Sequence, residues 1–211
     1  MAYSPYANPA PSYTGIDFDS LSQTRKDVLQ KWLPMVVPST EGDKKFDNLM
    51  THAKCEARRN ENPNFTTCGS LPGWLFSRLG LPALANYGLG GVRDVAMKIG
   101  CWVKHDELHN AMYKSAYGAD RRPLPGDVYL LGNSVNSAEI MHIGVIVNSN
   151  GDRWWTADAG QGEKKTQQAL YVPRKYQVNT RQLDGENYGV GTGRPPRRLV
   201  GWVDIDRALE I

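Results

Sequence analysis

One cysteine stands where a protein would activate a nucleophile. Cys68 precedes "GSLPGWLFSRLG", whose apolar residues are spaced like one face of a helix. The positive end of a helix dipole stabilises thiolate, which is the nucleophilic form of cysteine. Because Pro72 does not fit a smooth helix that begins at Cys68, the helix is either kinked or begins with Ser70 as N-cap and Pro72 in its first turn. Both alternatives leave Cys68 at or just before the helix N-terminus, as a candidate nucleophile.

A cysteine nucleophile needs a base, and His142 is the best placed of the four histidines. It lies in "EIMHIGVIV", an apolar and β-branched run that predicts a buried strand. Gly144 falls on the same face of that strand and leaves space beside the imidazole. The alternative is a core histidine whose ring nitrogens bond to the backbone. We take His142 as the candidate general base.

The following strand offers a carboxylate that could orient the imidazole. "NSNGD" predicts a hairpin, and a three-residue loop with Gly151 in the left-handed conformation pairs His142 with Asp158 on one face of the sheet. A two-residue Asn-Gly turn instead shifts the register by one residue and places Asp158 on the other face. We favour the three-residue loop because it gives a carboxylate on a buried strand a partner. Gln161 is a weaker candidate for the orienting residue.

The elements that must position these residues change in type after Arg121. Before it, amphipathic spacing predicts helices, and after it, short apolar runs separated by Gly, Asn and Ser predict a mostly antiparallel sheet. Helices are expected over residues 17–33 (closed by Pro34), 42–59, from Cys68 or Ser70 to Gly80, 90–100 and 105–118, and strands over 127–132, 139–147, 153–158, 169–173 and 199–205. Helices followed by strands indicate an α+β fold. Residues 1–16 read as an extended tail and residues 17–211 as one domain.

Three further patterns concern structure more than chemistry. Asp127, in the turn "PGD", is expected to cap that turn through its side chain and not to take part in catalysis. Trp154 and Trp155 are neighbours on a predicted strand and are expected on opposite faces of the sheet. The Gly/Pro/Arg-rich stretch over residues 184–198 is expected to be a long loop.

The order of four features resembles the NlpC-type cysteine peptidases and the related cysteine/histidine-dependent amidohydrolase (CHAP) family, both papain-like. These features are Cys68 at a helix start, the Pro-Gly-Asp turn at 125–127, His142 followed by an apolar-Gly-apolar run, and Asp158 on the next strand. The resemblance covers residues 64–160. It implies a papain-like α+β domain with Cys68 as nucleophile, His142 as general base and Asp158 as orienting residue, and it implies no metal or organic cofactor.

The same resemblance implies a cysteine amidase or endopeptidase that hydrolyses amide bonds in bacterial peptidoglycan peptides. The net charge of +3 suits a weak attraction to an anionic wall polymer and is too small to indicate nucleic acid. No signal peptide and no membrane span is evident. We therefore expect synthesis in the cytoplasm and delivery by a specialised route, as for a type VI secretion effector with an immunity partner, or a phage lysin. The alternatives are a papain-like toxin that cleaves or deamidates a protein, and a non-catalytic binding module.

Other candidate sites are weaker. His105 and His109 have zinc-ligand spacing, but Asp106 stands where the metalloprotease pattern has Glu, and no third ligand is evident. Three cysteines cannot all pair within one chain, although a Cys55–Cys101 disulfide can form in an oxidising compartment. "GLGGVRD" and "GVGTG" follow no convincing strand and are expected to be loops without phosphate-binding function.

Overall fold

Helices come first in the chain and strands dominate its second half. A computed structural model describes residues 10–50, 68–80, 112–114, 122–132, 140–161, 168–177, 181–185 and 196–210. Its helical elements are η1 (Phe18–Ser20), α1 (Gln23–Asp27), η2 (Val28–Trp32), α2 (Leu33–Val36), α3 (Lys44–Met50), α5 (Ser70–Arg78) and α9 (Ile205–Ala208). Its strands are β1 (Ser39–Thr40), β2 (Met112–Lys114), β3 (Val128–Gly132), β4 (Ile140–Asn148), β5 (Arg153–Gln161), β6 (Gln168–Gln177), β7 (Gln182–Gly185) and β8 (Arg197–Val203). None of these helices is long and apolar enough to cross a membrane.

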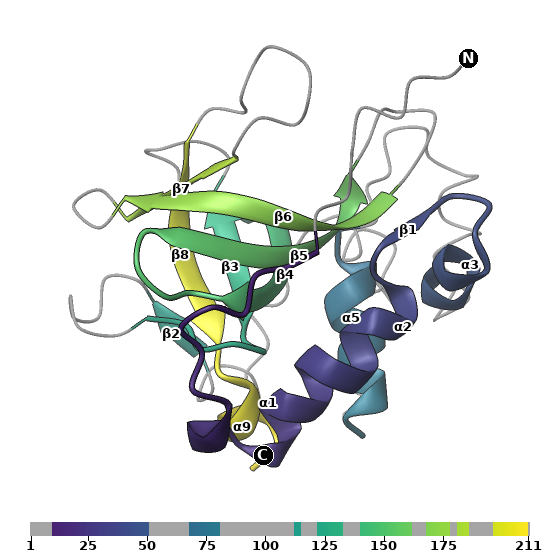
Figure 1. Cartoon of the computed structure of the whole chain (residues 1–211). Coiled ribbons are helices and arrows are strands. Elements are labelled where there is room, and N and C mark those ends of the chain that lie inside the picture. Colours follow the sequence, from purple (N-terminus) through teal and green to yellow (C-terminus); the bar gives the residue numbers. More distant parts are fainter. Residues whose placement is uncertain are drawn as a thin grey trace.

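Six of the described strands close into an antiparallel β-barrel (Figure 1). Hydrogen-bonded neighbours run from β3 through β4, β5, β6 and β7 to β8, and β8 pairs again with β3. The short strand β7 completes the ring, because one of its edges pairs with β6 and the other with β8. Outside the ring, β1 extends the sheet from β6 and β2 extends it from β8.

The predicted fold class is therefore wrong. We expected a papain-like α+β domain of the NlpC/CHAP type, with N-terminal helices followed by a mostly antiparallel sheet, and the described strands instead form a closed six-stranded barrel with few and short helices. Strands of an open sheet and of a barrel share one alternating pattern, so the pattern does not distinguish them. The deciding element is β7, whose short and mostly polar sequence "QLDG" overlaps the predicted loop.

Two element predictions also need correction. The first helix does not end before Pro34, because α2 continues it to Val36. In η2 the Leu33 N–H donates to the Val28 carbonyl, which makes a wider, π-helical turn. A proline ring crowds the carbonyl one turn before it, and the wider turn relieves this crowding for Pro34. Met112–Lys114, predicted as part of a helix, form β2 because they pair with the edge of β8. The predicted helix at residues 90–100 lies outside the described residues.

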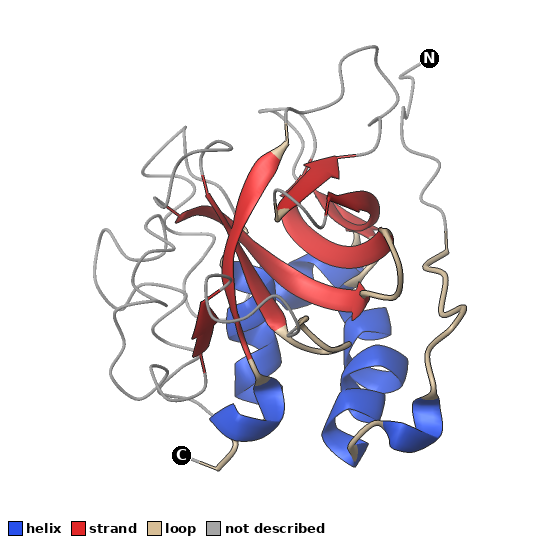
Figure 2. Cartoon of the chain, turned by 90° about the vertical axis from the view of Figure 1, so that its left-hand side faces the viewer, coloured by secondary structure: helices blue, strands red, loops and turns tan. Residues whose placement is uncertain are grey.

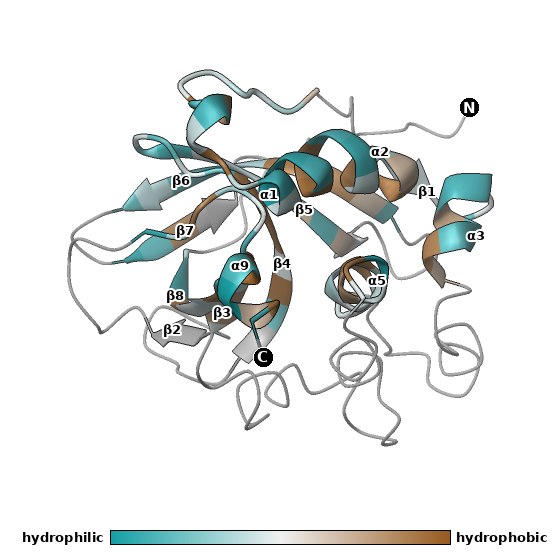
Figure 3. Cartoon of the chain, turned by 90° about the horizontal axis from the view of Figure 1, so that it is seen from below, coloured by the Kyte–Doolittle hydropathy of each residue, from teal (hydrophilic) through white to brown (hydrophobic). Residues whose placement is uncertain are grey.

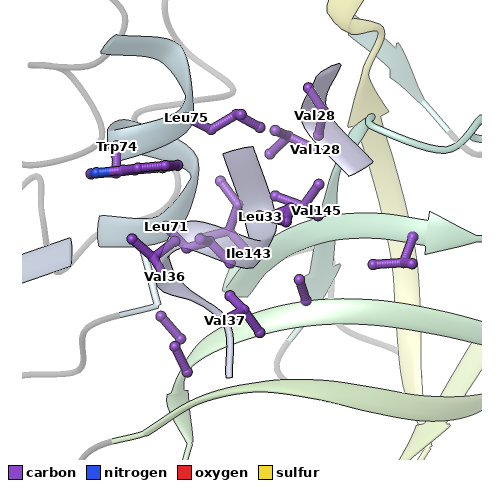
Figure 4. Packing of buried hydrophobic residues seen from close by; sticks show 14 of the residues in the cluster. Val28, Leu33, Val36, Val37, Leu71, Trp74, Leu75, Val128, Ile143 and Val145 are labelled. Carbon is purple, nitrogen blue, oxygen red and sulfur yellow. The ribbon is translucent and has the colours of Figure 1, made fainter. Parts of the chain in front are cut away.

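Two apolar clusters lie on the two faces of the barrel wall. The inner cluster draws on all six strands and therefore fills the barrel: Tyr129, Leu131, Ile146, Trp154, Tyr176, Leu183, Leu199 and Trp202. The outer cluster packs the helices on one side of the barrel, as Figure 2 shows, and includes the residues labelled in Figure 4. Trp154 belongs to the inner cluster and Trp155 packs against the outer one, which confirms their predicted split.

The helices that cover the barrel are amphipathic. In Figure 3 the outward side of α1 is hydrophilic, and apolar colour lies on β4 and β5 beneath the helices. Leu71 and Leu75 of α5 are fully buried in the outer cluster together with Ile143 and Val145 of β4. At roughly 25 cal/mol per Å² of apolar surface removed from water, this packing dominates the energy that holds α5 on the barrel. It fixes the helix that follows Cys68 against the strand that carries the candidate base.

Arg25 is a buried cation that ties the N-terminal helix to the barrel and to α9. Its side chain is 2% exposed, and it donates to the Pro125 carbonyl at 2.8 Å and to Asp127 at 2.7 Å. Two further ion pairs reach Asp204 at 2.8 Å and Asp206 at 2.7 Å. This role of Arg25 was not predicted from the sequence, because its partners lie about 100 and 180 residues further along the chain.

Asp127 caps its turn, as predicted. The backbone N–H of Leu124 donates to its Oδ2 at 2.7 Å, and the N–H of Ile205 donates to its Oδ1 at 3.2 Å. Burial raises the pKa of Asp127 to about 7, although the Arg25 charge and the Leu124 hydrogen bond oppose that rise. Asp127 thus joins the start of β3 to Arg25 and to α9.

Candidate active site

The helix α5 places Cys68 against the barrel. Gly69 is the N-cap and Ser70 the first helical residue, so Pro72 lies in the first turn and Cys68 directly precedes the cap. The prediction that Cys68 sits just before a helix N-terminus is confirmed, with the N-cap one residue earlier than the alternative that used Ser70. The helix contacts β4 and β5 (Figure 1), and Cys68 is 3% exposed. The thiol is therefore held at the wall of the barrel that carries His142.

His142 and Asp158 meet inside the barrel, but not as a directly opposed pair. The ladder pairs Val145 with Ala157 and Ile146 with Thr156, which places Gly144 opposite Asp158 and His142 two residues further along β4. The predicted pairing of His142 with Asp158 is wrong by two residues. Asn148 pairs with Trp155 and not with Asp152, a shift of three residues, and the irregularity between Ile146 and Asn148 recovers one of them. A two-residue shift preserves the face of the strand, so the two side chains still converge: His142 Nε2 lies 2.6 Å from Asp158 Oδ1.

Gly144 makes this convergence possible. A Cβ atom at position 144 would lie 2.4 Å from Asp158 Oδ1, 2.7 Å from Tyr129 Cε1 and 2.9 Å from the Ala157 carbonyl oxygen. These separations are below any ordinary contact distance of a Cβ atom. The space that the sequence indicated beside His142 is therefore occupied by the Asp158 carboxylate and the Tyr129 ring.

The Asp158 carboxylate is fully buried and is held through both oxygens. Oδ1 accepts a hydrogen bond from the Tyr129 hydroxyl and contacts His142 Nε2, while Oδ2 accepts from Thr156 Oγ1 at 2.5 Å and from Arg174 Nη2 at 3.1 Å. Burial alone would raise the pKa of Asp158, but the charges of Arg174 and His142 and the hydrogen bonds outweigh it, so the pKa is lowered below its usual value. Asp158 is therefore an anion at neutral pH.

The Cys68 thiol is hydrogen-bonded to the same imidazole. Its side chain hydrogen-bonds with His142, and with Nε2 facing Asp158, Nδ1 is the ring nitrogen left for the thiol. Burial lowers the pKa of His142, but the Asp158 charge and the contacts with Asp158 and Cys68 outweigh burial and raise it overall. The exposed fraction is 0% for Asp158, 3% for Cys68 and 7% for His142, so the carboxylate is the innermost member of this series.

Three members of this cluster were not predicted from the sequence: Tyr129, Thr156 and Arg174. Thr156 and Arg174 also bond to each other, with Arg174 Nε 2.9 Å from Thr156 Oγ1. One signal was available for Thr156, since it is two residues before Asp158 and so shares its face of the strand. The signal for Arg174 is that it directly follows the predicted strand 169–173. An arginine buried at the end of that strand would need an acidic partner.

The other candidates are not part of this cluster. Gln161, the alternative orienting residue, is the last residue of β5, and its side chain is not described. The possible zinc ligands and the possible disulfide fall outside the described residues: Cys55, Cys101, His105 and His109. In the part of the chain that the structure describes, no group of three or more His, Cys, Asp or Glu residues could hold a metal ion.

No protein-family model matches the chain, and neither a curated protein nor a solved structure matches it. The chemistry of this protein is therefore inferred from its own residues: a thiol, an imidazole and a buried carboxylate in hydrogen-bonded series.

Proposed function

We propose that this protein is a cysteine hydrolase of amide bonds, with Cys68, His142 and Asp158 as a Cys-His-Asp triad. The observation that carries the proposal is the series of contacts from the Cys68 thiol to His142 and from His142 Nε2 to the buried Asp158 carboxylate. A nucleophile that bonds to a base, with the base oriented by a third group, is the arrangement that nucleophilic catalysis requires.

The proposed reaction has two steps. In the first, the Cys68 sulfur attacks the amide carbonyl carbon, and His142 gives its proton to the leaving amine, so that a thioester forms and the C–N bond breaks. In the second, His142 takes a proton from water, the hydroxide attacks the thioester, and the thiol and a carboxylic acid are released. The ionised Asp158 stabilises the imidazolium in both steps, in keeping with the raised pKa of His142.

The proposed substrate class is the peptide part of bacterial peptidoglycan. The ordered motifs around Cys68, residues 125–127, His142 and Asp158 resemble those of NlpC-type and CHAP enzymes, which act on such peptides. The proposal rests on that motif order and on the site chemistry, since the fold is a closed barrel. A net charge of +3 is compatible with approach to an anionic wall polymer.

Digestion of purified peptidoglycan tests the proposal. Wild-type protein and Cys68→Ala are incubated with walls of several bacterial species, and the products are identified by mass spectrometry. We expect the wild type to release defined peptide fragments whose masses identify the cleaved bond, and Cys68→Ala to release none above background. Release by both proteins would exclude Cys68 as the nucleophile. If neither releases fragments, the wall assignment is wrong and protein substrates are tested next.

Alkylation tests the activation of Cys68 without any substrate. Iodoacetamide reacts with thiolate, and a thiolate that is paired with imidazolium persists at lower pH than in an ordinary cysteine. We expect Cys68 to be alkylated below neutral pH and faster than Cys55 and Cys101, as measured by peptide mass spectrometry. His142→Ala is expected to remove this advantage. Equal rates for all three cysteines would favour the non-catalytic alternative.

A further inference from the structure

Arg174 adds a fourth member to the proposed site. We propose that Arg174 is a positioning residue of this hydrolase: it holds the buried Asp158 carboxylate ionised and oriented toward His142, and it balances the charge of the thiolate–imidazolium pair. The inference rests on the proposed function, because it assigns a role within that same site. It extends the triad from β5 to the neighbouring strand β6.

The geometry gives Arg174 a single well-defined place. Its guanidinium is 6% exposed and is held at two points, with Nη2 3.1 Å from Asp158 Oδ2 and Nε 2.9 Å from Thr156 Oγ1. Its Cζ atom also lies over the Tyr129 ring, 5.6 Å from the ring centroid. Thr156 and Tyr129 in turn bond to Asp158. Both neighbours of the arginine therefore also hold the carboxylate.

The two carboxylate oxygens have separate tasks. Oδ1 faces His142 and orients its imidazole. Oδ2 faces Arg174. Arg174 reaches the site through its bond to Asp158 Oδ2, so it acts through Asp158. A rotation of the carboxylate away from Oδ1–His142 would break the contacts on Oδ2, and the Arg174 bond resists that rotation.

Charge balance explains why a cation is needed here. With Cys68 as thiolate and His142 as imidazolium, Asp158 would leave the cluster with a net charge of −1 in a buried place. Arginine is always protonated, so Arg174 brings that sum to zero. Without it, the buried cluster would favour uptake of a proton, and the thiol would be populated at the expense of the thiolate.

The ionisable groups of this cluster come from four neighbouring strands and from the residue before the α5 N-cap. They are Cys68, Tyr129 from β3, His142 from β4, Asp158 from β5 and Arg174 from β6. The next on β6 is Tyr176, whose charged neighbours are Arg122 and Arg181. Arg174 is thus the cation bonded to Asp158 within this described cluster.

The test is the pH dependence of Cys68 alkylation in Arg174→Met, Arg174→Gln and Arg174→Lys. In the two neutral variants we expect the midpoint of the iodoacetamide profile to rise by about one pH unit, because a nearby positive charge has been removed. Arg174→Lys keeps the charge and is expected to shift the midpoint by less than about half as much. Lys175→Met is the matched control, since this neighbour on β6 is exposed, and its midpoint is expected to equal that of the wild type.

A purely structural role would give a different result. Lower stability with an unchanged midpoint in the neutral variants would overturn the proposal, as would a shift in Arg174→Lys equal to theirs. If Arg174→Met does not fold, Arg174→Gln replaces it, because glutamine keeps a hydrogen-bond donor for Asp158. If neither neutral variant folds, Arg174→Lys is the test. A midpoint close to that of the wild type then supports the proposal, and a rise of a full pH unit contradicts it. The readout needs no substrate, so failure of the proposed function, seen as wild-type protein that is inert on walls and on protein substrates, is distinguishable from failure of this inference.

Discussion

Gly144→Ala is expected to lower the free energy of unfolding by about 3 kcal/mol and to abolish the preferential alkylation of Cys68. The added methyl group would lie 2.4 Å from Asp158 Oδ1 and 2.7 Å from Tyr129 Cε1. Its third close neighbour is the backbone carbonyl of Ala157, which cannot move without disturbing the β4–β5 ladder. The carboxylate must therefore turn away, which leaves His142 and Arg174 with a displaced partner.

The measurement is urea denaturation together with the iodoacetamide profile. Gly151→Ala in the same hairpin is the matched control: nothing lies within 4 Å of a Cβ atom there, and the only cost is its positive φ of 65°. That cost is about 1–2 kcal/mol, with no effect on Cys68 reactivity. If Gly144→Ala were as stable as Gly151→Ala and equally reactive, the close approach of Asp158 to Gly144 would be wrong.

Arg25→Met is expected to destabilise the folded protein by about 3–5 kcal/mol, because it removes one partner of a buried ion-pair cluster. The variant leaves Asp127, which is 1% exposed, without its cation at 2.7 Å, and it also releases the Pro125 carbonyl. Asp204 and Asp206 are partly exposed and can turn to water, so Asp127 accounts for most of the loss. Denaturant unfolding measures the effect, and Lys26→Met one residue away is expected to cost about 0.5 kcal/mol or less.

The loss in Arg25→Met should grow with pH. Burial raises the folded-state pKa of Asp127 to about 7, against the opposing charge of Arg25, so removal of Arg25 raises it further. A raised carboxyl pKa contributes stability at low pH that is lost as pH rises through the folded-state value. The wild type completes this loss near pH 7, whereas the variant continues to lose stability above it. A difference in unfolding free energy that stays constant from about pH 5 to about pH 9 would contradict this account.

The chemistry-bearing residues could be found from sequence because their signals are local. Cys68 precedes a helix whose amphipathic pattern and Pro72 are readable within a dozen residues, and His142 lies on an apolar strand. Asp158 was assigned to the correct face although the register was wrong by two residues, because side chains alternate with a period of two. Strand type and facing direction are thus short-range properties of this chain.

The barrel and the inner half of the site were decided only by tertiary structure. Closure depends on β7, a short polar segment that becomes a strand because both of its edges find partners, β6 and β8. No local pattern singles out Arg25 or Arg174. Folding brings Arg25 the carboxylate of Asp127, about 100 residues away in the chain, and brings Arg174 the carboxylate of Asp158 on the neighbouring strand. Sequence alone thus determined which residues could react and which way they face, since backbone periodicity acts over a few residues. It did not determine which strands meet or which charges pair, since those depend on contacts between segments far apart in the chain.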